Sequence, residues 1–146
     1  MHRLADDVTG AVRIPLIHIA DATAVALKDK GLRTVGLLGT RYTMELDFYR
    51  GRLEQKHGLR ILVPDDAGRT IVHDVIYHEL VRGLAREESR RAYISVIEEL
   101  TRRGAEGVIL GCTEIPMLIK DKDSPVPAFD TTRIHAAAAV NFALGG

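Results

Sequence analysis

Cysteine is scarce in this sequence: among 146 residues only Cys112 carries a thiol. A single cysteine excludes a disulfide within the chain and a metal site built on a Cys-x-x-Cys pair. The six histidines are scattered, and none falls in a His-Glu-x-x-His pattern. We therefore expect no metal site.

Long apolar runs and an excess of charge of either sign are also missing. No run approaches the roughly 20 apolar residues that cross a bilayer, and Asp6 and Asp7 stand where a signal peptide would be apolar. Twenty basic and twenty acidic residues cancel, which argues against nucleic acid or an anionic membrane as a partner. Tryptophan is absent, but 46% of the residues are hydrophobic, enough for the core of about one domain. These features predict a cytoplasmic protein without membrane or nucleic-acid partners.

Apolar runs of strand length alternate along the chain with segments of helical periodicity. Continuous apolar runs predict strands at residues 34–39, 60–64 and 106–110, and a short last strand at 126–129. Apolar residues three and four apart predict helices at 2–12, 22–30, 44–56, 70–82 and 87–103, a short helix after Cys112 and a final helix after Asp130. Helices between strands favour an α/β fold, doubly wound, with a mostly parallel sheet flanked by helices.

Individual residues set the expected ends of the first elements. Residues 14–19, which include Pro15, are apolar enough for a short strand or an extended segment. Asp21 is the expected N-cap of helix 22–30, and Gly31 is its expected stop. In helix 44–56 the residues predicted to face inward are Leu46, Tyr49 and Leu53.

The second half contains a predicted turn and a predicted cap. The run of Asp, Asp, Ala and Gly at 65–68 is typical of a turn, so helix 70–82 is expected to begin only at Thr70. Asp130 or Thr131 is expected to cap the final helix, on which Ile134, Ala138 and Phe142 share one side.

Two polar turns follow predicted strands. One runs from Thr40 to Thr43 after Gly39, and the other begins at Cys112 after Gly111. In open α/β sheets ligands bind beyond the carboxyl ends of the strands, where amides and small hydroxyls converge, so both turns are expected at one edge and form a candidate anion site. A simpler interpretation is that Thr40 or Thr43 only caps the following helix.

The Cys112 thiol has two interpretations from its local sequence. The thiol follows an apolar strand and precedes a short helix, where a helix dipole would stabilise a thiolate, lower the pKa and permit action as a base or nucleophile. Alternatively it is an inert buried thiol, since cysteine is among the most buried residue types. Two histidines, His73 and His78, lie five apart and so not on one helix face; we interpret them as solvated or hydrogen-bonded rather than as ligands.

Four motifs, in this order and spacing, resemble those of the cofactor-independent aspartate/glutamate racemases: Gly39-Thr-Arg-Tyr-Thr-Met44, Asp47-Phe-Tyr-Arg50, Ile76-Tyr-His-Glu-Leu80 and Gly111-Cys-Thr-Glu-Ile-Pro116. The resemblance covers essentially the whole chain but only about the latter two thirds of a family member. It implies two α/β domains with the active site between them, and one catalytic cysteine, or occasionally a threonine, from each. The Met1-His2 pair resembles the tail of the first catalytic motif.

The resemblance assigns roles to six residues. Cys112 corresponds to the second of two thiol bases that remove and return the α-proton of an amino acid. Thr40, Thr43 and Thr113 match positions around the substrate carboxylate. Glu114 matches a position that orients the cysteine or contacts the amino group, and Arg82 matches a basic residue that binds the side-chain carboxylate. For Arg82 the alternative is an ordinary exposed arginine.

The resemblance also implies a division of the chain. Residues 1–20 would be a remnant of the first racemase domain, 21–130 the racemase-like α/β domain, and 131–146 a C-terminal helix that packs on the first domain. The first catalytic cysteine and its neighbours would then lie upstream of this sequence. Without that domain the face of Ile134, Ala138 and Phe142 is expected to be exposed or to self-associate into a homodimer.

The resulting function is cofactor-independent racemisation of aspartate or glutamate, with the amino acid as the small-molecule partner. Pyridoxal phosphate is not expected, because no lysine has a buried Schiff-base setting in the predicted layout. Two alternatives remain. One is a related cysteine-dependent acid/base enzyme of the hydantoin racemase, arylmalonate decarboxylase or maleate isomerase type, and the other is a non-catalytic α/β fragment.

Overall fold

The core of the protein is a four-stranded, fully parallel sheet. The computed structural model describes residues 4–145. The strands are β1 (Thr34–Leu38), β2 (Arg60–Leu62), β3 (Gly107–Leu110) and β4 (Ala128–Asp130), in the spatial order β2-β1-β3-β4. Each successive strand therefore follows a helical crossover, as the alternation in the sequence predicts.

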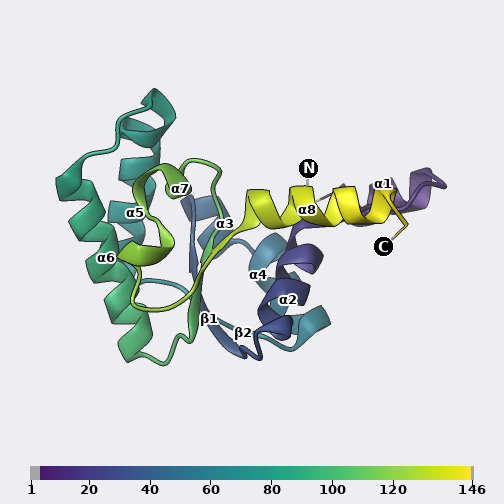
Figure 1. The fold of residues 1–146 in the computed structure, drawn as a ribbon, viewed down its shortest axis with the longest axis horizontal. Helices are drawn as coiled ribbons and strands as arrows, with labels where there is room; N and C mark the ends of the chain where they lie inside the picture. The colour runs from purple at the N-terminus through teal and green to yellow at the C-terminus, as the bar shows by residue number, and fades with distance from the viewer. Residues whose placement is uncertain (1–3, 146) are drawn as a thin grey trace.

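Helices cover both faces of this sheet (Figure 1). On one face lie α5 (Asp66–His78), α6 (Glu87–Arg102) and the short α7 (Ile115–Leu118), and on the other lie α2 (Ile19–Asp29) and α4 (Asp47–His57). The remaining helical segments are α1 (Ala5–Ala11), α3 (Arg41–Glu45), η2 (Leu80–Arg82), η3 (Asp121–Asp123) and α8 (Thr131–Ala143). The doubly wound α/β architecture is confirmed.

Alternating side chains of the strands feed two separate cores. Val108 and Leu110 of β3 pack with α5, α6 and α7, whereas Ile109 packs with α2 and α4. This period of two explains why the strands are apolar at every position: both faces are covered.

Three predictions concern the N-terminal part of the chain. Residues 1–3, which include the start of predicted helix 2–12 and the Met1-His2 pair, lie outside the described residues, and the described part of this segment forms α1. Residues 15–18 follow a bend at 13–14 and belong to no helix or strand among residues 4–145, and the backbone of His18 is extended. Helix α2 begins at Ile19 rather than Ala22, because the side chain of His18 accepts a hydrogen bond from the Ala20 amide and acts as the cap. The prediction of Asp21 as N-cap was wrong.

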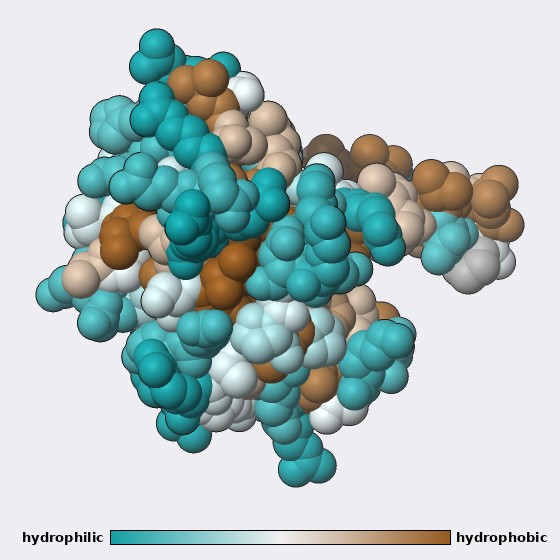
Figure 2. Space-filling model, turned by 60° about the vertical axis from the view of Figure 1, so that its left-hand side comes forward, coloured by the Kyte–Doolittle hydropathy of each residue, from teal (hydrophilic) through white to brown (hydrophobic). Residues whose placement is uncertain are grey.

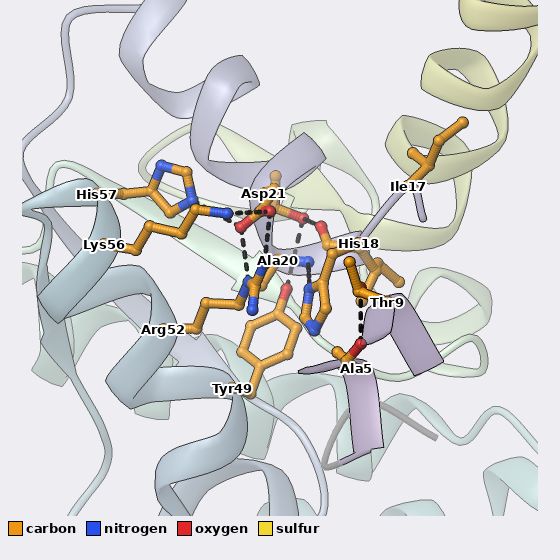
Figure 3. A network of polar contacts seen from close by, with 12 residues as sticks. Ala5, Thr9, Ile17, His18, Ala20, Asp21, Tyr49, Arg52, Lys56 and His57 are labelled. Carbon is orange, nitrogen blue, oxygen red and sulfur yellow. Dashed lines mark hydrogen bonds and ion pairs between the residues drawn. The ribbon is translucent and has the colours of Figure 1, made fainter. Parts of the chain in front are cut away.

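Asp21 instead holds α2 to α4 through a cluster of ion pairs (Figure 3). The carboxylate accepts two hydrogen bonds from Arg52 at 2.8 Å and one from Lys56 at 2.8 Å. The Nε2 atom of His57 lies 2.7 Å from one of its oxygens. The Arg52 guanidinium and the side-chain hydrogen bonds from His57 and Lys56 hold the pKa of Asp21 far below its usual range, although partial burial opposes them.

Two helix boundaries also differ. Asp65 caps α5 by accepting from the Gly68 amide, so residues 66–68 are helical rather than a turn, and after His78 the chain continues as η2. The predicted helix 44–56 is divided into α3 and α4 at Leu46, whose extended backbone leaves the side chain 45% exposed instead of buried. Tyr49 and Leu53 are buried as predicted.

The last helix extends away from the sheet, on the same side of the molecule as α1 (Figure 1). Asp130 caps α8 through the amides of Thr132 and Arg133, as one of the two predicted caps. The first half of α8 packs on α2, whereas residues 139–145 are all exposed. Figure 2 shows apolar side chains gathered on this projection, which include Val140, Phe142 and Leu144. Within residues 4–145 no helix has both the length and the apolar character needed to cross a membrane.

Candidate functional site

Three neighbouring strands end level at one edge of the sheet. The register pairs Leu38 of β1 with Leu110 of β3, and Leu110 with Asp130 of β4. Beyond these ends the Gly111 amide donates to the Leu38 carbonyl at 2.7 Å, and the Thr131 hydroxyl donates to the Leu110 carbonyl at 3.0 Å. The turns that follow β1 and β3 are thereby held side by side at the edge where ligands of such folds bind.

The turn after β1 brings two threonine hydroxyls together. Thr40 precedes α3, and its Oγ1 lies 3.3 Å from that of Thr43. The Thr40 side chain makes no capping hydrogen bond to α3, so the simpler capping interpretation does not hold for it. Both hydroxyls are half-buried and keep further hydrogen-bonding capacity.

Glycine is required where the two turns touch. A Cβ on Gly39 would lie 3.0 Å from the Thr43 Cβ, and a Cβ on Gly111 would lie 2.9 Å from the Leu38 carbonyl oxygen and 3.3 Å from the Thr43 Cγ2. Real Cβ atoms essentially never come as close as the Leu38 contact. The missing side chains let Thr43 sit directly beside the residue that precedes Cys112.

Cys112 is half-buried in this junction, and its pKa is raised rather than lowered. Burial is the largest cause, the backbone amide of Thr40 opposes it as a hydrogen-bond donor to the sulfur, and the nearby Glu114 carboxylate raises the pKa further. The predicted stabilisation by a helix dipole was wrong, because α7 starts only at Ile115 and is four residues long. Below its pKa the residue is a thiol, the form that donates a proton.

The buried cluster against which Cys112 packs contains a polar group. Tyr93 of α6 is 0% exposed and donates from its hydroxyl to the Val72 carbonyl at 2.8 Å. Burial is the main reason why the pKa of Tyr93 is raised, and the charges of Cys112 and Glu79 raise it further. Tyr93 therefore stays protonated within the buried cluster against which Cys112 packs.

The remaining predicted site residues, Glu114, Thr113 and Arg82, differ in how they lie relative to Cys112. Glu114 is half-buried and electrostatically coupled to Cys112, whereas the Thr113 side chain is exposed. Arg82 is exposed on η2, which packs against α7. Within the described part of the chain the Arg82 guanidinium makes no ion pair and no side-chain hydrogen bond. The fold thus brings Cys112, Thr40, Thr43 and Glu114 together and leaves Thr113 and Arg82 at the rim.

The sequence did not reveal the residues of α5 that hold the turn after β1 in place. The Nδ1 atom of His73 on α5 accepts a hydrogen bond from the Arg41 amide at 3.2 Å. The Arg41 guanidinium donates to the Thr70 hydroxyl at 2.7 Å. Of the expected settings for His73, solvated or hydrogen-bonded, the structure shows the second, but the partner is 32 residues away and no local pattern marks it. Within residues 4–145, no three His, Cys, Asp or Glu side chains are grouped so as to hold a metal.

Solved structures resemble this fold over nearly its full length. A crystal structure of a candidate Asp/Glu racemase from Yersinia pestis is 54% identical, has a TM-score of 0.96 and matches 99% of this chain and 63% of its own. An aspartate racemase homologue from Pyrococcus horikoshii is 37% identical with a TM-score of 0.90, and covers 97% and 62%. An aspartate racemase from Picrophilus torridus is 29% identical with a TM-score of 0.70, and covers 86% and 52%. The chain spans less than two thirds of each of these proteins.

Sequence comparisons agree with the structural ones. An uncharacterised protein from the pnlA 3′ region of Pectobacterium carotovorum subsp. carotovorum is 30% identical over 129 residues, which cover 87% of this chain and 84% of that protein. The model of the Asp/Glu/Hydantoin racemase family matches residues 1–139. The chain therefore belongs to the Asp/Glu/hydantoin racemase family.

Proposed function

We propose that the chain carries the Cys112 half of a cofactor-independent amino-acid racemase that interconverts L- and D-aspartate or glutamate by proton transfer at the α-carbon. One observation carries the proposal: the Cys112 thiol, the Thr40 amide and the Thr43 side chain meet where β1 and β3 end. Membership of the family, and the aspartate racemase name of the Picrophilus torridus protein, support it. A cytoplasmic location remains a prediction from the sequence.

In the proposed reaction the Cys112 thiolate takes the α-proton, the C–H electron pair moves to the α-carbon, and the negative charge spreads into the substrate carboxylate. The hydroxyls of Thr40 and Thr43 would stabilise that carboxylate. Thr113 and Glu114 would contact the substrate from the second turn, and Arg82 would pair with the side-chain carboxylate from η2. The raised pKa of Cys112 makes the thiolate fraction, and hence proton removal, increase with pH.

Racemisation needs a second base on the opposite face, and this sequence contains one cysteine. We therefore expect the chain alone to exchange the α-proton at one face and to return deuterium with retention of configuration. The test is incubation of each enantiomer of aspartate in deuterium oxide, with loss of the α-proton followed by NMR and enantiomeric purity by chiral chromatography. The expected result is Cys112-dependent exchange that rises with pH. Equal exchange by Cys112→Ala would overturn the proposal.

The family description includes hydantoin substrates, which favours one alternative specifically. Running glutamate, a substituted hydantoin, an arylmalonate and maleate in the same assay separates the related activities from aspartate racemisation. Exchange into the hydantoin alone would assign the chain to that branch. Absence of exchange into every substrate would favour a non-catalytic fragment, with aspartate binding as the remaining measurement.

A further inference from the structure

The turn that carries Thr40 is attached to α5 at two points, and neither attachment is part of the racemase proposal. The Arg41 guanidinium donates to the Thr70 hydroxyl, which in turn donates to the Asp66 carbonyl at 2.8 Å. One helical turn further on, the Nδ1 atom of His73 accepts from the Arg41 backbone amide. The two contacts fix both the side chain and the backbone of Arg41.

The Arg41 amide needs an external acceptor. Arg41 is the first residue of α3, and the first amides of a helix have no partner within it. The Thr40 side chain makes no capping hydrogen bond, so the helix start is satisfied instead by a ring nitrogen from another helix. Only a neutral imidazole with its proton on Nε2 can accept at Nδ1.

The backbone amide of the preceding residue, Thr40, interacts with the Cys112 thiol. Two consecutive backbone N–H groups leave the same turn: that of Thr40 lies near the Cys112 sulfur and lowers the pKa of the thiol, and that of Arg41 donates a hydrogen bond to His73. Their peptide units are joined at one Cα, so a shift of the Arg41 amide tilts the Thr40 amide as well. Loss of the acceptor at position 73 would therefore move the Thr40 amide relative to the sulfur and weaken its stabilisation of the thiolate.

Packing contacts also hold the His73 ring in place. Its ring packs on Tyr77 with a centroid separation of 4.6 Å, and it lines a hollow of about 250 Å³ with Arg41, Tyr42, Glu45 and Leu46. The Glu45 carboxylate in this hollow is engaged by Arg69 at 3.1 Å and by Arg41 at 3.6 Å. The ring is thus held by packing and by one hydrogen bond to the turn.

We propose that His73 is a positioning residue: its unprotonated Nδ1 holds the Thr40–Arg41 peptide so that the Thr40 amide points at the Cys112 sulfur. The inference deepens the proposed function and rests on it only where substrate is involved. Its own consequence, the reactivity of the thiol, can be measured without any substrate.

The experiment compares His73→Leu, which removes the acceptor, with His73→Asn, whose side-chain oxygen can take the Nδ1 position. His78→Leu, an exposed site on the same helix, is the matched control. Cys112 is the only cysteine, so the rate of iodoacetamide alkylation between about pH 7.5 and about pH 10 reports on that thiol alone. We expect His73→Leu to slow alkylation about threefold to tenfold at a fixed pH, with His73→Asn and His78→Leu within about twofold of wild type. An unchanged His73→Leu, or a His73→Asn as slow as His73→Leu, would overturn the proposal.

A measurement on the unaltered protein covers the case in which His73→Leu does not fold. Long-range ¹H–¹⁵N correlation spectra of histidine distinguish the two neutral tautomers. The expected result is the Nε2–H tautomer for His73, and an Nδ1–H tautomer would refute the inference. Failure of the racemase proposal gives a different outcome, because Cys112→Ala would then leave proton exchange unchanged while the tautomer and the alkylation rates stay as expected.

Discussion

A methyl group added at Gly111 tests whether the contact between the two turns builds the site. In Gly111→Ala the new Cβ would lie 2.9 Å from the Leu38 carbonyl oxygen, 3.3 Å from the Thr43 Cγ2 and 3.4 Å from a Leu37 methyl. The first of these atoms belongs to the backbone of β1, which cannot move without disturbing the sheet. The turn after β3 must therefore retreat, and Cys112 with it.

The cost can be worked out from the contacts. Overpacking of a tight site costs about 1 to 3 kcal/mol. Lengthening of the 2.7 Å hydrogen bond from the Gly111 amide to the Leu38 carbonyl adds about 1 kcal/mol. The smaller conformational entropy of unfolded alanine returns about 0.4 to 1 kcal/mol. The net loss of about 2 kcal/mol corresponds to a Tm about 4 to 8 °C below wild type for a chain of this size.

Differential scanning calorimetry measures the Tm, and iodoacetamide alkylation reports the displacement of Cys112. The matched control is Gly10→Ala, because a Cβ at helical Gly10 meets nothing within 4 Å, and its Tm should equal or slightly exceed that of wild type. A Gly111→Ala protein with a wild-type Tm and a wild-type alkylation rate would refute the argument that glycine is needed for the two turns to touch.

Three further changes test the electrostatics and the hydrogen bond of the buried Tyr93. Asp21→Asn should destabilise the protein by about 1 to 2 kcal/mol near neutral pH, a modest loss because the ion pairs of Asp21 are partly screened by water. The folded-state pKa of Asp21 is depressed, so the urea midpoints of variant and wild type should converge as the pH falls below about 4. A difference between the midpoints that does not change with pH would contradict this. Glu114→Gln removes a negative charge that raises the pKa of Cys112, so at a pH below that pKa the alkylation of Cys112 should accelerate about threefold to tenfold. A slower reaction would show that Glu114 assists the thiolate instead. Tyr93→Phe removes the donor to the Val72 carbonyl and should cost about 1 kcal/mol in urea unfolding, with no loss counting against a structural role for that bond.

The strands were predictable because both faces of the sheet are covered. Continuous apolar runs located β1 and β3 to within a residue or two, and their ends located the two turns with Thr40, Thr43 and Cys112. The start of α5 was missed because Asp, Ala and Gly at 66–68 are typical of turns. Gly68 is there for a tertiary reason: a Cβ would lie 2.8 Å from Pro64 and 3.6 Å from Val96.

The properties of individual site residues depended on contacts that no local pattern records. The pKa of Cys112 follows from burial and from Glu114, whereas the sequence suggested only the helix that comes after it. His73 contacts a backbone amide 32 residues away, and His18 caps α2 although histidine is not a preferred cap. Such roles arise from the packing of separate elements, which single-sequence periodicity does not describe.

The two ends of α8 differ in packing, and this difference predicts where the protein unfolds locally. Its first residues are anchored by Asp130 and by packing on α2, but residues 139–145 are all exposed. Unfolding of that outer end breaks helical hydrogen bonds without exposing the core, so it is a local event with a free energy well below that of the whole domain. Backbone amides beyond Ala138 should therefore exchange with solvent deuterium through fraying of the helix end, whereas those of α6, which buries Tyr93, Ile97 and Leu100, should exchange only when the whole domain unfolds.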